Sequence, residues 1–210
     1  MTATLTPPSP TLLKGQPSTS PFATIPSNDT ERLRLLQLIQ QHALKFGTFT
    51  LASGKQSSYY LDCRLVTLLS EGADLIGRLM ARQLLPTQAD AVGGVVIGAA
   101  PMVTATGLAA TAQGLPLNGF LIRKATKGHG TQKLVEGHIA AWMRVVLVED
   151  VVTTAGSLVE GIQALKAEYP SVVVSGVLSL VDRNAGGDQV FQQLGIPYQA
   201  LFNVNEVIQK

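Results

Sequence analysis

The sequence predicts an α/β protein in which a parallel sheet carries helices on both faces and follows a small amino-terminal hairpin. Short β-branched runs alternate with helical segments from about residue 91 to residue 181, and this alternation is typical of parallel strands joined by crossover helices. The run Val145–Val148 is entirely apolar, as expected of a strand buried on both faces. With 210 residues and a hydrophobic fraction of 46%, the chain can form one well-cored domain.

The amino-terminal part is predicted to contain a tail, a helix and a hairpin. Residues 1–27 are rich in Pro, Ser and Thr and predict a disordered tail, so that residues 28–210 form a single domain. Asn28 and Glu31 have capping-box spacing and predict a helix over residues 30–45. Residues 48–66 predict a hairpin, with strands at Thr48–Leu51 and Tyr59–Val66.

The remaining elements are predicted from apolar periodicity and from breakers such as Pro170. A second helix opens at Ser70. The strands that follow are Ala91–Ile97, Leu117–Ile122, one within Ile139–Val148, and Val172–Val181; the helices are Met102–Gln113 and Leu158–Tyr169.

Composition excludes several classes of function. A net charge of +2 is too small to favour nucleic acid or an anionic membrane as a partner. No apolar run approaches the length of a membrane span. Cys63 is the lone cysteine, so it is expected to be a small buried residue, and the chain is expected to be intracellular and cytoplasmic.

The segment from Val145 to Ser157 predicts a ligand site. Glu149 and Asp150 follow the apolar run, where open α/β sheets place their ligand crevice. The turn Thr153–Ser157 offers hydroxyls and free backbone N–H groups to a phosphate. A ribose 5-phosphate reconciles a phosphate cradle with two acids, because the acids accept hydrogen bonds from the sugar hydroxyls. The alternative is an ordinary strand–turn–helix with a capping hydroxyl and two solvated acids.

The segment Arg123–Gly130 predicts a basic lid. It holds three cations, a histidine and two glycines without an apolar anchor, which suits a loop that closes over a polyanion such as pyrophosphate. Mg²⁺ is expected as cofactor, held mainly by substrate oxygens with no dedicated protein site. Such chemistry depends mostly on positioning and on stabilising the leaving group. The alternative is a solvated hairpin.

With these residues, the chain resembles the type I phosphoribosyltransferases. Val146–Ser157 is similar to their motif for 5-phosphoribosyl 1-pyrophosphate (PRPP), with an apolar strand, two acids and a Thr-rich turn. Within that family the resemblance is to the orotate enzymes, whose lid is matched by Arg123-Lys124-x-x-Lys127-x-His129-Gly130. Their hairpin is matched by residues 46–60, and their terminal strand end by Asp182-Arg183. The similarity covers about residues 30–205.

The resemblance implies transfer of ribose 5-phosphate from PRPP to orotate in pyrimidine biosynthesis, by a homodimer whose subunits share the lid. Lys127 and His129 would be catalytic. The PRPP-binding residues would be Arg123, Lys124, Lys127, His129, Glu149, Asp150, Thr153, Thr154, Ala155, Gly156 and Ser157. The orotate-binding residues would be Tyr60, Leu61, Thr153 and Arg183. Two positions depart from the pattern, since Ala52 and Gly98 stand where some relatives carry basic residues that contact the diphosphate.

Two other functions remain open from the sequence. One is a phosphoribosyltransferase for a purine, which Arg183 disfavours because a neutral purine offers no carboxylate. The other is a non-catalytic regulator that senses PRPP and binds nucleic acid, for which a basic surface is expected.

Overall fold

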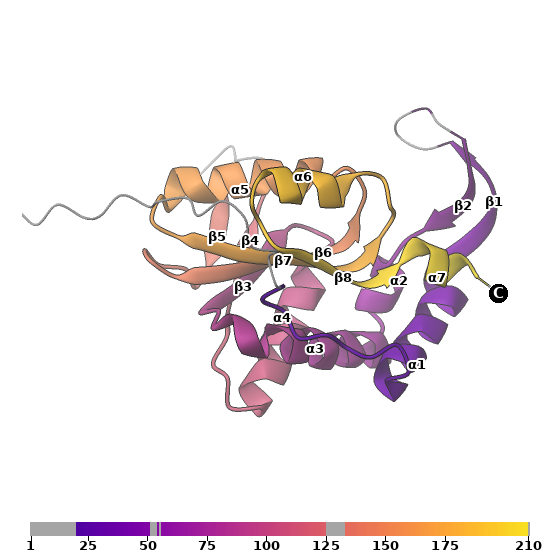
Figure 1. Cartoon of the computed structure of the whole chain (residues 1–210), viewed down its shortest axis with the longest axis horizontal. Coiled ribbons are helices and arrows are strands. Elements are labelled where there is room, and N and C mark those ends of the chain that lie inside the picture. Colours follow the sequence, from indigo (N-terminus) through magenta and orange to yellow (C-terminus); the bar gives the residue numbers. More distant parts are fainter. Residues whose placement is uncertain (1–19, 51–53, 55, 125–132, 210) are drawn as a thin grey trace, which may run out of the picture.

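The fold, shown in Figure 1, is described from a computed structural model for residues 20–50, 54, 56–124 and 133–209. The helices are α1 (Thr30–Leu38), α2 (Arg64–Thr67), α3 (Ser70–Leu84), α4 (Ala100–Ala112), α5 (Gly156–Glu168), α6 (Gly187–Gln193) and α7 (Val204–Ile208). The strands are β1 (Leu44–Thr50), β2 (Gln56–Leu61), β3 (Ala91–Val95), β4 (Asn118–Ile122), β5 (Val135–Gly137), β6 (Arg144–Val152), β7 (Val173–Asp182) and β8 (Tyr198–Asn203).

The predicted α/β architecture is confirmed. A six-stranded sheet has the order β5-β4-β3-β6-β7-β8, and only β5 runs antiparallel to its neighbour. Helices α5 and α6 cover one face, while α3 and α4 cover the other, and the β1–β2 hairpin projects from one end (Figure 1). Within the described ranges, no helix is long and apolar enough to cross a membrane.

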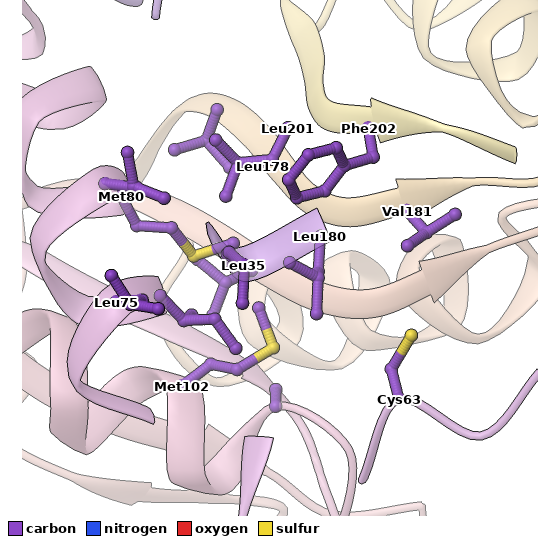
Figure 2. Close-up of a cluster of buried hydrophobic side chains, with 14 of the residues drawn as sticks. Leu35, Cys63, Leu75, Met80, Met102, Leu178, Leu180, Val181, Leu201 and Phe202 are labelled. Carbon is purple, nitrogen blue, oxygen red and sulfur yellow. The ribbon is translucent and has the colours of Figure 1, made fainter. Parts of the chain in front are cut away.

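Burial on both faces of the sheet explains why Val145–Val148 of the central strand β6 are all apolar. Val146 and Val148 pack into the core between the sheet and helices α1, α3 and α4. Val145 and Leu147 pack into the second core, on the face covered by α5 and α6. Figure 2 shows the first core, where side chains of α1, α3 and α4 meet those of β7 and β8. Because alternate residues from Val145 to Val148 are buried on opposite faces, this part of β6 has no polar side chain.

The hairpin differs from the prediction at both ends. Helix α1 is followed by a π-helical turn at Ile39–Ala43, and β1 begins at Leu44 because Leu44–Phe46 pairs with Tyr59–Leu61. Strand pairing therefore overrides the helical spacing of Phe46. The second strand ends at Leu61 instead of Val66, since the Asp62 carboxylate accepts the Arg64 N–H at 3.2 Å and starts the short helix α2.

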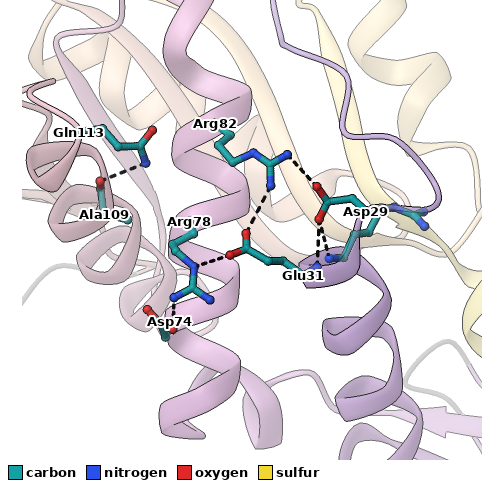
Figure 3. Close-up of polar contacts among 8 residues, drawn as sticks. Asp29, Glu31, Asp74, Arg78, Arg82, Ala109 and Gln113 are labelled. Carbon is teal, nitrogen blue, oxygen red and sulfur yellow. Dashed lines mark hydrogen bonds and ion pairs between the residues drawn. The ribbon is translucent and has the colours of Figure 1, made fainter.

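The cap of α1 is Asp29 instead of Asn28. The Asp29 carboxylate accepts N–H groups of the first turn at 3.0–3.1 Å. Glu31 is not in a capping box and forms ion pairs with Arg78 at 2.9 Å and Arg82 at 3.3 Å, while Arg82 also binds Asp29 at 2.8 Å (Figure 3). These contacts join the start of α1 to α3.

The prediction of a disordered tail is wrong for residues 20–27. Phe22 is 5% exposed and belongs to the first core, next to Gly176 of β7. The Ala23 N–H donates to the Gln83 carbonyl at 3.0 Å, and Gln199 Nε2 donates to the Ala23 carbonyl at 3.2 Å. Residues 20–27 are therefore anchored because an aromatic side chain and backbone groups find partners on α3, β7 and β8. Residues 1–19 lie outside the described part.

Candidate active site

The predicted ligand-binding residues meet in one cavity at the carboxyl edge of the sheet. Its volume is about 580 Å³, and it opens beyond the ends of β3, β6 and β7 beside the hairpin. The predicted residues that line it are Tyr60, Leu61, Lys124, Glu149, Asp150, Thr153, Thr154, Ala155, Gly156, Ser157 and Arg183. This is the edge at which open α/β sheets bind ligands.

Arg123 and Lys124, at the start of the predicted basic lid, have different surroundings. Lys124 lines the cavity, and its Nζ lies 3.5 Å from Ser157 Oγ. Arg123 does not line the cavity and instead pairs with Glu136 at 3.7 Å, while its N–H donates to the Leu134 carbonyl at 2.8 Å. The predicted catalytic residues Lys127 and His129 lie outside the described residues.

The two acids lie within β6, because this strand continues to Val152 instead of ending at Val148. Asp150 Oδ1 accepts the N–H of Val151 at 2.9 Å. Gly98 approaches the same carboxylate so closely that a Cβ there would lie 2.6 Å from Oδ1. Glycine at 98 therefore allows the Asp150 side chain to occupy this position.

The acids do not carry two full negative charges. Burial, followed by a hydrogen bond with Asp150 and repulsion from its charge, raises the pKa of Glu149 to about 8. The Glu149 carboxyl is therefore mainly protonated at neutral pH and offers an O–H donor as well as acceptor oxygens. This removes much of the conflict between an acidic pair and a phosphate cradle.

The phosphate cradle is shaped by an unusual backbone at its centre. Ala155 has a φ of 62° at the amino terminus of α5, where no side chain of the described residues caps the helix. A left-handed alanine costs about 1–2 kcal/mol, and the surrounding packing holds it, because the Gly187 N–H donates to the Thr153 carbonyl at 2.9 Å. The first N–H groups of α5 are thus left to bind an anion.

Arg183 is held on the opposite side by an aromatic ring. The Arg183 guanidinium carbon lies 5.1 Å from the centre of the Tyr59 ring, which fits a cation–π contact. Its N–H donates to the Val152 carbonyl at 2.9 Å. Tyr60 and Leu61 line the cavity as predicted. The supporting role of Tyr59 was not predicted, because it depends on the pairing of β2 with β1.

Part of the cavity wall was not predicted from the sequence. Asp62, Cys63 and Arg64 line it beside Leu61, and Gly98 lines it from the segment after β3. The signal was an acid and an arginine two residues apart at a strand end. Cys63 is fully buried, as predicted, and burial raises the pKa of its thiol.

The cavity offers carboxyl oxygens that suit a metal ion. Among residues 20–50, 54, 56–124 and 133–209, no group of three or more His, Cys, Asp or Glu side chains is arranged to hold one. Glu149 and Asp150 supply carboxyl oxygens at the cavity, and oxygen is the donor that Mg²⁺ prefers. The pair suits a Mg²⁺ ion that takes most of its ligands from a substrate.

Comparison with known sequences identifies relatives of the chain. A model of the phosphoribosyl transferase domain matches residues 66–191. The orotate phosphoribosyltransferase of Synechocystis sp. is 43% identical over 180 residues, which cover 85% of this chain and 89% of that protein. The orotate phosphoribosyltransferase of Nostoc sp. is 41% identical over 182 residues, covering 86% and 87% of the two chains.

Solved structures give the same result for the fold. The crystal structure of Mycobacterium tuberculosis orotate phosphoribosyltransferase with Fe(III) dicitrate superposes with a TM-score of 0.75 at 34% identity, covering 85% of this chain and 99% of that one. The same enzyme in complex with PRPP gives a TM-score of 0.71 at 30% identity, covering 84% and 98%.

Proposed function

This chain belongs to the orotate phosphoribosyltransferase family, and we propose that it transfers ribose 5-phosphate from PRPP to orotate, forming orotidine 5′-monophosphate and pyrophosphate in pyrimidine biosynthesis. The observation that carries the proposal is the single cavity in which a phosphate cradle, a pair of acids and a guanidinium on an aromatic ring converge. These groups suit, in turn, a sugar phosphate, its hydroxyls and a planar acidic base.

The 5-phosphate binds the turn Thr153–Ser157. Hydroxyl groups of Thr153, Thr154 and Ser157 and the free N–H groups at the start of α5 donate to its oxygens. The dipole of the 13-residue helix α5 adds partial positive charge at this end. Ala155 and Gly156 keep side chains small where the phosphate approaches.

The ribose hydroxyls bind Glu149 and Asp150. Because Glu149 is mainly protonated when the site is empty and its O–H is shared with Asp150, the remaining carboxyl oxygens of the two acids accept hydrogen bonds from the sugar hydroxyls. The pair thus recognises vicinal hydroxyls without placing two full negative charges beside a polyanion.

Orotate binds between the hairpin and the end of β7. Arg183, held against Tyr59, offers a planar fork to the orotate carboxylate. Tyr60 and Leu61 cover the ring, and the Thr153 hydroxyl contacts its edge. A neutral purine leaves Arg183 without a partner, which disfavours that alternative.

The transfer step needs a stabilised leaving group. The bond between ribose C1 and the pyrophosphate oxygen breaks with its electron pair passing to pyrophosphate. A ring nitrogen of orotate bonds to C1, and its N–H proton passes to the departing pyrophosphate. Lys127 and His129 act from the lid, with Arg123 and Lys124, to bind the diphosphate and exclude water. Arg123 must leave Glu136 to do so.

The reaction depends on Mg²⁺ and on a homodimer in this proposal. Asp150 is the carboxylate that would help to hold a Mg²⁺ ion at the cavity, and the ion would supply positive charge that stabilises the pyrophosphate leaving group. The lid of one subunit completes the site of the other. The lone buried Cys63 favours the cytoplasm as the location.

A panel of bases tests the proposal. Pyrophosphate release from PRPP is measured in parallel with orotate, uracil, adenine and hypoxanthine. We expect turnover with orotate alone, because only orotate carries the carboxylate that Arg183 binds. Turnover with a purine and none with orotate would contradict the assignment. A shift of an RNA or DNA probe at physiological salt, without turnover, would instead indicate the regulator.

A further inference from the structure

The geometry points to Arg64 as a further binding residue for the diphosphate of the donor, an inference that rests on the proposed function. Arg64 is the first residue of α2 and lines the cavity beside Asp62 and Cys63. Its side chain is half-exposed, so a ligand can reach it without a change of fold.

Asp62 holds the guanidinium in one orientation. The Asp62 carboxylate accepts hydrogen bonds from Nε and Nη2 of the Arg64 guanidinium, each at 2.8 Å, and from the backbone N–H of Arg64 at 3.2 Å. Asp62 is itself fixed, because its N–H donates to the Ala43 carbonyl at 3.0 Å. Within the described part of the chain, Nη1 of Arg64 makes no hydrogen bond. The Nε–Nη2 edge of the Arg64 guanidinium is thus occupied by Asp62, and Nη1 remains able to donate a hydrogen bond to a ligand.

The other two described cations that line the cavity contact different residues. The cationic residues that line it, among those described, are Arg64, Lys124 and Arg183. Lys124 lies at the phosphate cradle, next to Ser157, and Arg183 lies against Tyr59 on the side of the base. Arg64 reaches the cavity from α2 and interacts electrostatically with Asp150, the ribose-binding acid, so it would add a second described cation to the diphosphate contact proposed for Lys124. A cation near the ribose but away from the 5-phosphate suits the group attached to C1.

Position 98, next to Asp150, cannot carry a cationic side chain that contacts the diphosphate while the acid keeps its present position. A Cβ at this position would lie 2.6 Å from Asp150 Oδ1, so a longer side chain there requires the acid to move. Arg64 supplies positive charge near the same acid from α2. A purely structural pair with Asp62 is the competing explanation, and an exposed pair of this kind contributes little to folding.

Binding of inorganic pyrophosphate to the full chain, measured by calorimetry with Mg²⁺, separates the two explanations. We expect Arg64→Gln to weaken pyrophosphate binding by about tenfold or more, because it removes a charge-assisted hydrogen bond. Affinity for ribose 5-phosphate is expected to stay unchanged, since the cradle is intact. In turnover, the KM for PRPP should rise while the KM for orotate stays constant.

Arg34→Gln is the matched control. Arg34 binds Glu71 through Nε at 2.6 Å and Nη2 at 3.0 Å, and its side chain is 44% exposed, against 49% for Arg64. It does not line the cavity. A pyrophosphate affinity that is unchanged in Arg64→Gln, or reduced equally in both variants, would overturn the inference.

Two further variants keep the test decisive. Asp62→Asn retains the cation but loosens the fork, so it should weaken pyrophosphate binding less than Arg64→Gln does. Arg64→Lys should fall between Arg64→Gln and the unaltered protein, since it keeps the charge; a Lys variant as weak as the Gln variant, with an unchanged melting temperature, would contradict a role of charge. Failure of orotate in the base panel would overturn the proposed function but leave this binding result valid.

Discussion

The raised pKa of Glu149 predicts how the stability of the ligand-free protein depends on pH. The ordinary carboxyl pKa is 4.5, and burial beside Asp150 raises that of Glu149 to about 8. Between these values the folded chain binds more protons than the unfolded chain, so the free energy of unfolding falls as pH rises. The stabilisation is present in full below about pH 4.5 and is lost as pH passes through about 8.

The magnitude follows from the same values. A rise from 4.5 to about 8 corresponds to at most roughly 5 kcal/mol at 1.36 kcal/mol per pKa unit. Because the Glu149 side chain is not completely buried, water weakens the penalty on its charged form, and we expect about 1–3 kcal/mol to be observed. Glu149→Gln removes this dependence, since an amide is neutral throughout and still donates a hydrogen bond to Asp150.

Urea unfolding without substrate at pH 5.5, 7 and 9 measures the effect. The unaltered protein should lose about 1–3 kcal/mol across this range relative to Glu149→Gln. Glu160→Gln replaces an exposed acid that lines the same cavity, and its curve should run parallel to that of the unaltered protein. If Glu149→Gln also runs parallel, the Glu149 carboxyl is ionised in the folded chain and the reasoning is refuted.

The other predictions concern the lid, the base site, the anchored segment and the metal. Lys127→Ala should lower kcat by about 10²-fold or more with an unchanged melting temperature; unchanged turnover would remove the lid from the mechanism. Arg183→Lys should raise the KM for orotate by about tenfold or more and leave the KM for PRPP unaltered, because lysine lacks the fork that rests on Tyr59; equal changes in both would argue against a contact with the base. Phe22→Ala should lower the free energy of unfolding by about 3 kcal/mol in urea, since Phe22 fills the core beside Gly176; a loss under 1 kcal/mol, well below the usual range for a buried Phe, would show that residues 20–27 do not anchor the fold. Chelation of divalent ions by EDTA should abolish turnover, and added Mg²⁺ should restore it; full activity in EDTA would exclude the metal.

The sequence predicted the elements that carry a strong local signal, such as an apolar run or a cluster of hydroxyl residues. It did not predict the element boundaries and side-chain environments that are set by contacts between residues far apart in the chain. Strand β6 and the cradle were found because an uninterrupted apolar run and a hydroxyl-rich turn are both local signals. The short elements β5, α6, β8 and α7 were not predicted, since none is long enough to show a clear period. The start of β1 and the end of β2 were wrong because pairing and the Asp62 cap set them. The pKa of Glu149 could not be predicted, since it depends on packing around the strand end.

Two consecutive residues, Val152 at the end of β6 and Thr153 directly after it, link the proposed phosphate and base sites. The Val152 carbonyl accepts the N–H of Arg183, and the Thr153 carbonyl accepts the N–H of Gly187, each at 2.9 Å. Both donors lie just beyond β7, whose end pairs with β6 through Val152 and Asp182. The turn proposed to bind the 5-phosphate and the arginine proposed to bind the base are therefore parts of one hydrogen-bonded unit. In the proposed reaction, a fixed spacing between them would position the base near ribose C1 before transfer, which is the main requirement for a step that needs no side-chain nucleophile.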